Sequence, residues 1–345
     1  MSSSSAPPLS LLDLPPELLE EIARLCHEDD RITQTKRSIH GLAQTCRLLR
    51  EICAPYIFGL VDDRKLSSER FEQNILPHCT HLIHSIRLHS WWAPYNFKHL
   101  RALTAVKHVE INAGGAQFGG WPYYDDDRDY IEVSDSDDSD EEDEDEGDWL
   151  AEAIYSLLPT VKSLDLTSFM TADALVEVLS RAPHLEKLEF RDLRQAFPRD
   201  RASFNEYAYP KYVLRGATEV VDAIAAMPHL YSLTLDWDAC VLPHAFMLHP
   251  STTSLPLRTL TIACYRFDHN TSRFVDLVSP TLEEFGLHVS GELDNPPPLF
   301  SVPMPRLRTL KLSLCPNSLA RTDKALAPRL GKVVVSRQKW RPHGF

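Results

Sequence analysis

The chain of 345 residues has little glycine and few cysteines, and it lacks any long apolar run. Its twelve glycines form no phosphate-binding loop, and the sequence contains neither a G-x-S-x-G elbow nor an H-E-x-x-H zinc helix. The seven cysteines are odd in number and scattered without C-x-x-C spacing, which indicates reduced thiols in a reducing compartment. We therefore expect a protein that is not an enzyme and that needs no cofactor.

Membrane and export signals are also missing from the sequence. No stretch is long and apolar enough to span a bilayer, and residues 1–10 are rich in serine and proline but contain no basic residue. We expect this start to be disordered, and we expect no membrane partner. The predicted location is the cytoplasm, the nucleus or both.

The negative charge of the chain is concentrated in one segment. The net charge is −13, yet residues 125–148 hold sixteen acids against the single Arg128, so the remaining residues carry a charge of +2. A segment of this composition repels itself and buries little apolar surface. The sequence therefore predicts a disordered acidic insertion over residues 124–148.

Three serines in this insertion lie among acids at the spacing favoured by acid-directed kinases: Ser134, Ser136 and Ser139. Phosphorylation would add roughly 1.5 to 2 negative charges at each site. Two interpretations remain open for the insertion. It is either a solvated spacer or an arm that binds a basic protein.

One short pattern recurs nine times: an apolar residue followed by further apolar residues three and five positions later. The steps between copies are 23, 55, 24, 45, 27, 25, 25 and 23 residues, and six copies have proline two positions ahead. Because the last two apolar positions alternate, each copy predicts a short strand with one buried face. The copies begin at Ile83, Val106, Val161, Leu185, Leu230, Leu257, Leu282, Leu307 and Leu330.

Helical patterns precede several of these strands, at residues 151–158, 172–182 and 219–226. Proline then ends each helix, because it lacks a donor and disfavours helical geometry in the residue before it. Repeated units of helix, proline and parallel strand predict an α/β solenoid over residues 62–337, followed by a tail at 338–345. The alternative is that the copies are strands of an ordinary α/β domain.

From about residue 78 to residue 337 this pattern resembles the leucine-rich-repeat family. The resemblance implies a horseshoe with its strands on the concave face, closed at the amino end by a helical cap. A repeat fold of this kind does not by itself specify a function.

Residues 11–61 are helical in pattern and lack the triad. In LPPELLEEI, proline stands where a helix begins, and Leu18, Ile22 and Leu25 form one stripe. A second apolar stripe includes Leu42, Cys46 and Leu49. Fifty residues with so few large side chains would be marginally stable alone, so the region needs a partner surface.

LPPELLEEI and LAQTCRLLREICAPYIF resemble the two halves of the F-box as it occurs in fungal F-box proteins. The resemblance implies a three-helix module that binds the adaptor subunit of an SCF-type cullin ubiquitin ligase. The alternative is that these residues are only the core of a helical cap. The matched adaptor-binding positions are Leu14, Pro15, Leu18, Ile22, Leu42, Cys46 and Leu49.

Within each triad, the residue between the last two apolar positions points away from the core and is a candidate for target binding. The charges of this row are basic at both ends and acidic between them, which favours a charged protein surface over nucleic acid. The row contains Arg87, Glu110, Asp165, Glu189, Thr234, Thr261, Gly286, Lys311 and Val334.

The 45-residue step predicts a second insertion, over residues 191–216, that is rich in arginine and aromatic residues. Such residues are enriched at binding hot spots, so Arg194, Arg199 and Arg201 are further target-binding candidates. The alternative is an atypical repeat whose aromatic residues complete the core.

His78, Cys79, His81 and His84 lie within seven residues, but their spacing matches no common zinc site. We therefore expect no bound metal. The sequence as a whole predicts a substrate receptor of a cullin ubiquitin ligase. A second hypothesis is a ubiquitin-independent scaffold whose acidic insertion binds basic partners. A third is a hydrolase or metal-dependent enzyme that uses the cluster from His78 to His84.

Overall fold

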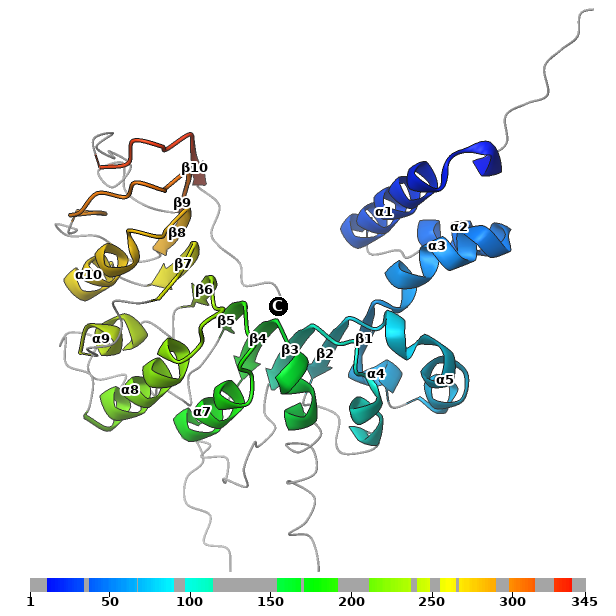
Figure 1. Ribbon diagram of the computed structural model, residues 1–345, viewed down its shortest axis with the longest axis horizontal. Coiled ribbons are helices and arrows are strands. Elements are labelled where there is room, and N and C mark those ends of the chain that lie inside the picture. The colour runs from blue at the N-terminus through cyan, green and yellow to red at the C-terminus, as the bar shows by residue number, and fades with distance from the viewer. Residues whose placement is uncertain are drawn as a thin grey trace, which may run out of the picture.

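One parallel sheet of ten strands organises the protein, and its strand order follows the order of the chain (Figure 1). The computed structural model describes residues 11–33, 37–66, 68–89, 97–113, 154–168, 171–191, 211–236, 241–248, 255–264, 267–289, 298–313 and 326–336. The strands are β1 (Leu60–Asp62), β2 (Ser85–His89), β3 (His108–Ala113), β4 (Ser163–Ser168), β5 (Lys187–Arg191), β6 (Ser232–Leu235), β7 (Thr259–Cys264), β8 (Glu284–Val289), β9 (Thr309–Ser313) and β10 (Lys332–Ser336).

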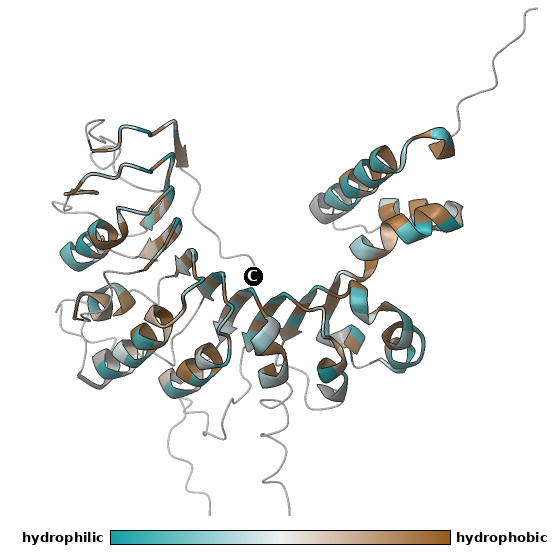
Figure 2. Cartoon of the chain, viewed as in Figure 1, coloured by the Kyte–Doolittle hydropathy of each residue, from teal (hydrophilic) through white to brown (hydrophobic). Residues whose placement is uncertain are grey.

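The sheet is curved, and the connecting helices lie along its convex side (Figure 1). The longer helices are amphipathic, with hydrophobic residues on one side and polar residues on the other (Figure 2). The connections contain α4 (Asp63–Leu66), the π-helical turn η2 (Phe71–Ile75), α5 (Leu76–Cys79), η3 (Thr80–Leu82), η4 (Phe97–Ala102), η5 (Leu158–Thr160), α7 (Ala172–Ser180), α8 (Lys211–Ala225), α9 (Val241–Leu248) and α10 (His269–Val278).

The apolar triads form the core between the sheet and these helices. At β4, for example, Leu164 and Leu166 of the strand and Val161 just before it are buried together with Leu175 and Val178 of α7. The same burial holds for the first eight triads, and it changes only at β10, where Val333 and Val335 are exposed. The expected alternation of the strands is thus confirmed, and it leaves one whole face of the sheet free of the core.

The same backbone arrangement joins each strand to the next. The carbonyl just before each of the first nine strands accepts hydrogen bonds from two consecutive N–H groups, one at the end of the following connection and one at the start of the next strand, as Lys107 O does from Lys162 and Ser163 at 2.8 and 3.0 Å. The arrangement occurs nine times and fixes the register of neighbouring strands. The accepting carbonyls belong to Gly59, His84, Lys107, Lys162, Glu186, Tyr231, Arg258, Glu283 and Arg308.

Residues 11–58, which precede the first strand in the chain, form a separate small helical module. It contains η1 (Leu11–Asp13), α1 (Pro16–Thr33), α2 (Arg37–Thr45) and α3 (Arg47–Phe58). Its buried apolar residues are Leu19, Ala23, Ile39, Ala43, Leu49 and Cys53, and four of them, Ala23, Ile39, Ala43 and Cys53, form one packed cluster. The module joins the sheet at Gly59, where an added Cβ would collide with the carbonyl oxygen of Pro55.

This architecture corrects the expected fold class. The chain is an α/β fold on one all-parallel sheet, which was the alternative interpretation of the triads, and the leucine-rich-repeat horseshoe with a helical cap is wrong. The helical module does not close the sheet as a cap, because its core is separate from the main core. The edge strand is instead β1, which carries no triad, and the connections range from 3-10 turns to the fifteen-residue α8 without one uniform unit.

The second insertion was predicted over residues 191–216, but the first residue of this range belongs to a strand and the last six belong to a helix. Arg191 continues the alternation of β5 as its last residue, and α8 already begins at Lys211. Residues 124–148, 1–10 and 338–345 lie outside the described residues.

The contrast between β3 and β10 predicts the effect of core truncation. Val109 and Val333 occupy equivalent register positions, but Val109 is fully buried and Val333 is 46% exposed. We expect Val109→Ala to lower the free energy of unfolding by about 2 kcal/mol, because it removes buried methyl groups and leaves a cavity. Val333→Ala should cost less than about 0.5 kcal/mol. Urea unfolding of both variants measures the difference, and equal losses would contradict this assignment of the core.

Strands β3 and β4 are direct neighbours although the acidic segment separates them in sequence. Deleting residues 125–147 should therefore leave the melting temperature nearly unchanged, because loop closure costs free energy only slowly as a loop lengthens. Differential scanning calorimetry measures the effect. A large fall in the melting temperature would show that the acidic segment stabilises the fold.

Candidate functional site

The free face of the sheet carries the predicted target-binding row as one continuous line. Register pairs Arg87 with Glu110, Glu110 with Asp165, and Asp165 with Glu189 on successive strands. The line continues through Thr234, Thr261, Gly286 and Lys311 to Val334. The structure thus brings together the nine residues that the triad spacing singled out.

Ion pairs link the acidic part of this row, which we call the central cluster: Arg87, Glu110, Asp165, Glu189 and Arg191. Arg87 Nε lies 2.6 Å from Glu110 Oε2. Arg191 binds two carboxylates, with Nη2 at 2.8 Å from Asp165 Oδ2 and Nε at 2.9 Å from Glu189 Oε1. The cluster therefore contains three carboxyl groups and two guanidinium groups.

Asp165 is the buried centre of the central cluster. The residue is 5% exposed, and its Oδ1 atom has no hydrogen-bond partner among the residues that the structure describes. Burial raises the pKa of the Asp165 carboxyl to about 7, and the negative charge of Glu189 adds to this effect while Arg191 opposes it. Around neutral pH the Asp165 carboxyl is therefore protonated in a substantial fraction of the molecules.

His108 lies beside the cluster, on β3 and on the same face as Glu110. Burial lowers the pKa of its imidazole, and the nearby Glu110 only partly offsets this effect. The environment of His108 therefore favours the neutral form of its imidazole.

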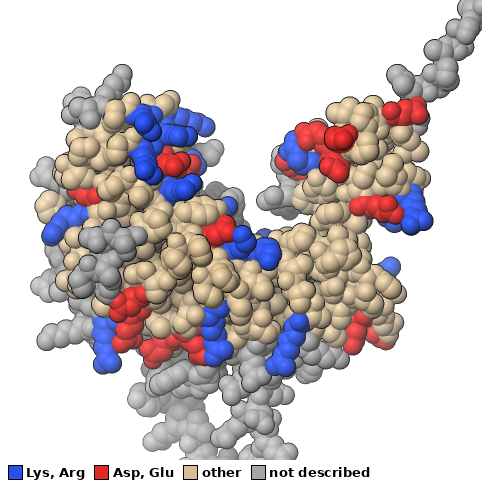
Figure 3. Space-filling model, viewed as in Figure 1, with Lys and Arg blue, Asp and Glu red and all other residues tan. Residues whose placement is uncertain are grey.

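Beyond the cluster the exposed row becomes neutral and then basic. Thr234, Thr261 and Gly286 occupy its positions on β6, β7 and β8. On β9, Lys311 Nζ lies 2.5 Å from Glu284 Oε1 of the neighbouring strand. Figure 3 shows basic residues gathered over β9 and β10, across an open hollow from the helical module.

The helical module exposes several of the predicted adaptor-binding residues. Pro15 and Leu18 are exposed, with Leu18 at 50%, and Leu14 and Ile22 are partly exposed. Leu42 and Cys46 are also partly exposed, and Cys46 Sγ accepts a hydrogen bond from Leu49 N at the start of α3. Leu49 is 1% exposed, so its side chain supports the helices from inside.

Four further apolar residues of the module are exposed, and none was among the predicted adaptor-binding positions: Leu11, Leu12, Leu25 and Leu48. Leu25 was visible in the sequence, because it lies seven residues after Leu18 on the same stripe of α1. Leu11 and Leu12 precede the helix, so helical periodicity gives no signal for them. On the sheet, sequence analysis missed Arg191 as a member of the exposed face.

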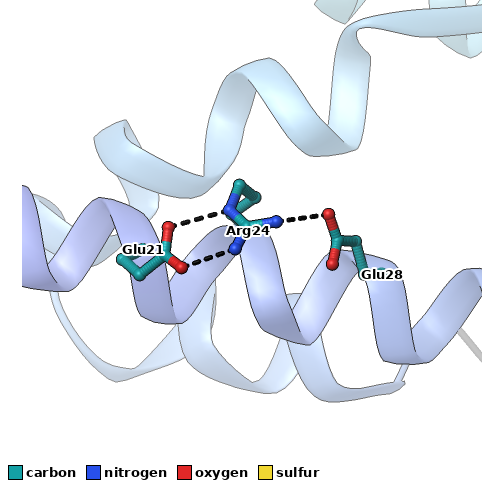
Figure 4. A network of polar contacts seen from close by, with 3 residues as sticks. All are labelled: Glu21, Arg24 and Glu28. Atoms are coloured by element: carbon teal, nitrogen blue, oxygen red, sulfur yellow. Dashed lines mark hydrogen bonds and ion pairs between the residues drawn. The ribbon is translucent and has the colours of Figure 1, made fainter. Parts of the chain in front are cut away.

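A polar network covers another side of α1 (Figure 4). Arg24 forms ion pairs with Glu21 and Glu28, one turn before and one turn after it. These exposed pairs lower the pKa of Glu21 and support the helix only weakly. By helical geometry the network lies away from the buried Leu19 and Ala23 and borders the exposed leucines, because Glu21 is three residues after Leu18 and four before Leu25.

Some predicted residues lie outside the described part of the chain. These are the target-binding candidates Arg194, Arg199 and Arg201 and the phosphorylation candidates Ser134, Ser136 and Ser139. The sequence-based predictions for them remain predictions.

Other polar clusters in the structure have local structural partners. Within the described residues, no group of three His, Cys, Asp or Glu side chains is placed to hold a metal ion, and this includes His78, Cys79, His81 and His84. On the convex side, His244 Nε2 lies 2.9 Å from Asp268 Oδ2, while the other oxygen of Asp268 accepts from Thr271 N. Asp268 thereby starts α10 and joins it to α9.

Compared with known proteins, the chain matches no family model, and no curated protein sequence is similar to it. The described helices include none with the length and hydropathy that a membrane crossing requires. The functional argument therefore rests on the sequence and on the geometry given above.

The pKa of Asp165 predicts a pH dependence of stability. Its folded-state pKa of about 7 is higher than the ordinary value of 3.8, so the folded state binds the proton more tightly than the unfolded state. The resulting stabilisation is present below about pH 4 and is lost as the pH rises through about 7. Melting temperatures measured from about pH 5 to about pH 8 should fall less steeply for Asp165→Asn than for the wild type.

The matched control is Asp222→Asn, which changes an exposed aspartate on α8. This control should keep the slope of the wild type. An unchanged slope in Asp165→Asn would contradict the raised pKa.

Proposed function

We propose that this chain is the substrate-recognition subunit of an SCF-type cullin ubiquitin ligase. The helical module binds the adaptor subunit, and the exposed face of the sheet binds a target protein. In this proposal other subunits transfer ubiquitin, and the chain itself makes and breaks no covalent bond.

The exposed apolar surface of the helical module carries the proposal. Five large apolar side chains lie exposed within residues 11–48: Leu11, Leu12, Leu18, Leu25 and Leu48. A partner that covered these side chains would be stabilised, because water contact is unfavourable for apolar groups. These residues coincide with, or directly flank, the segments that resemble the F-box.

The small core of the module supports the same interpretation. The buried apolar residues of the described part of the module are only Leu19, Ala23, Ile39, Ala43, Leu49 and Cys53, so the three helices gain limited stability from their own packing. A partner that covers the leucines of α1 and α3 would bury additional apolar area. The module is joined to the sheet through the segment around Gly59, which leaves its leucine surface available.

The sheet supplies a surface suited to a target protein. Its free face presents acidic, neutral and basic stretches in a fixed register, which provides a specific charge pattern. This face lines the hollow between the helical module and the last strands (Figures 1 and 3). A target bound there would lie on the same side of the molecule as the module.

The double substitution Leu18→Asp with Leu25→Asp tests adaptor binding. Both side chains are about half exposed, so the fold should tolerate the change, whereas two carboxylates cannot be solvated once a partner covers them. We expect the amount of co-purified adaptor and cullin to fall by at least about tenfold. Affinity purification of the tagged full chain with quantitative mass spectrometry measures it.

A control variant carries the same charge change elsewhere: Leu248→Asp with Val335→Asp, at two exposed positions on α9 and β10. It should keep adaptor and cullin at wild-type amounts. Wild-type protein that captures neither subunit would contradict the proposal. Recovery of basic proteins through residues 125–148 in their place would then favour a ubiquitin-independent scaffold.

A further inference from the structure

Three carboxyl groups lie at one level of the free face, on three neighbouring strands. Register pairs Glu110 of β3 with Asp165 of β4, and Asp165 with Glu189 of β5. Neighbouring strands are about 4.8 Å apart, and like charges at directly paired positions destabilise a sheet. A row of three carboxyl groups therefore costs stability unless cations balance it.

The arginines of the central cluster balance this row only in part. Arg87 Nε pairs with Glu110 Oε2 at 2.6 Å. Arg191 pairs with Asp165 Oδ2 through Nη2 and with Glu189 Oε1 through Nε. With all three carboxyl groups ionised, the cluster holds three negative and two positive charges, so one negative charge is in excess.

The second oxygen of each acid is an unused acceptor. Within the part of the chain that the structure describes, Glu110 Oε1, Asp165 Oδ1 and Glu189 Oε2 form no hydrogen bond or ion pair. Asp165 Oδ1 is the most costly of the three, because this atom is buried as well as unpaired. The cluster therefore lacks hydrogen-bond donors as well as positive charge.

The two glutamates lie nearer to solvent than Asp165 does. Their side chains are 17% exposed for Glu110 and 35% exposed for Glu189, against 7% for Asp165. Because an aspartate is one methylene group shorter than a glutamate, the Asp165 carboxyl lies closer to the sheet than the carboxyl groups on either side. Figure 3 shows acidic and basic side chains next to one another at the base of the hollow. A cation that enters the hollow therefore reaches the glutamates first and lies above Asp165.

We propose that the central cluster binds one cationic side chain, lysine or arginine, of a target protein. Its charged group lies between Glu110 and Glu189, donates hydrogen bonds to their unused oxygens and balances the charge of Asp165 beneath it. The inference rests on the proposed function, in which it names the chemistry that the sheet recognises on its target.

The geometry favours an ammonium or guanidinium group over a metal ion. Two strand spacings, about 10 Å, separate β3 from β5, so Glu110 and Glu189 can lean toward each other with one ammonium group between their oxygens. A lysine ammonium has three N–H donors, and an arginine guanidinium has five. Among the described residues, no group of three His, Cys, Asp or Glu side chains is placed to hold a metal ion. Arg87 and Arg191 would also repel a divalent ion more strongly than a single positive charge.

Asp165 makes binding at this site dependent on pH. A cation above Asp165 favours the ionised carboxyl, whose pKa in the chain without a target is about 7. Affinity for a cationic side chain should therefore rise as the pH increases from about 6 to about 8. The charged and titratable groups that face Asp165 from the neighbouring strands are Arg87, His108, Glu110, Lys187, Glu189 and Arg191.

The variant Asp165→Asn separates Asp165 from His108, the other group whose ordinary pKa lies near this range. Burial lowers the pKa of His108, so Asp165→Asn should remove most of the rise in affinity between about pH 6 and about pH 8. A full rise retained in this variant would contradict the place of Asp165 beneath the bound cation.

Capped fluorescent peptides test the proposal on the purified full chain. Each short peptide has lysine, arginine or acetyl-lysine at its centre and serine and alanine elsewhere. We expect the lysine or the arginine peptide to bind at least about tenfold more tightly than the acetyl-lysine peptide, because acetylation removes the charge. Fluorescence anisotropy measures the affinities, and the ratio between the lysine and arginine peptides shows which cation the site takes. Equal binding of all three peptides, or binding of none, would overturn the proposal.

The variant Glu110→Gln with Glu189→Gln removes two charges with little change in side-chain shape. It should reduce the preference for the cationic peptides to less than about twofold. The matched control is Glu177→Gln with Glu219→Gln, which removes two glutamates that also pair with arginine, on α7 and α8. The control has the same net charge as the test variant and should keep the wild-type preference, with melting temperatures used to check that both variants fold. Equal loss in both would indicate a response to total charge and overturn the proposal.

The acidic segment at residues 125–147 could attract the same peptides, and a chain that lacks it separates the two sites. This deletion variant should keep the preference for the cationic peptides. A preference that disappears with the segment but survives Glu110→Gln with Glu189→Gln would overturn the assignment to the central cluster.

Peptide binding is measured on the purified chain without other subunits, and adaptor capture is measured separately through the leucines of α1. Capture of the adaptor without a preference for cationic peptides would overturn this inference alone. A preference for cationic peptides without adaptor capture would contradict the proposed ligase function and leave the cation site in place.

Discussion

The paired hydrogen bonds to one carbonyl before each strand hold this protein in register. Each such carbonyl, from Gly59 to Arg308, accepts hydrogen bonds from the last N–H group of the next connection and the first N–H group of the next strand. Because these bonds involve only the backbone, the connections differ widely in length and in side chains without shifting the strands. Every other property of the sheet, including the line of residues on its free face, depends on this constant register.

The triads were sufficient to predict the strands, their parallel pairing and the row from Arg87 to Val334. The last two apolar residues of each triad are two positions apart, so they share the buried face of a strand and the residue between them lies on the opposite face. They could not predict β1, since Leu60–Asp62 is short and has one buried residue. The class of fold was also beyond them. Whether the helical module caps the sheet depends on which apolar surfaces pack together, and Leu49 and Leu18 look alike in the sequence although one is buried and the other exposed.

The ion pairs of the central cluster depend on side-chain geometry between strands that are distant in sequence. Spacing placed Glu110, Asp165 and Glu189 in one row, but it gave no sign that Arg191 would bridge two of them. The raised pKa of Asp165 follows from the burial of its carboxyl. The alternating pattern of the sequence instead predicts a solvent-exposed carboxyl at this position. Charge along the row was readable from the sequence, whereas the environment of each charge required the structure.

The outer edge of β10 has a consequence for self-association. Among the described residues no further strand pairs with β10, and Val333, Val334 and Val335 are exposed on it. An apolar strand with a free edge is a template on which a second chain can extend the sheet. Lys332 at the start of this strand, with Arg329 just before it, places positive charge against any identical edge that approaches, so the cations of this region also protect the molecule from aggregation.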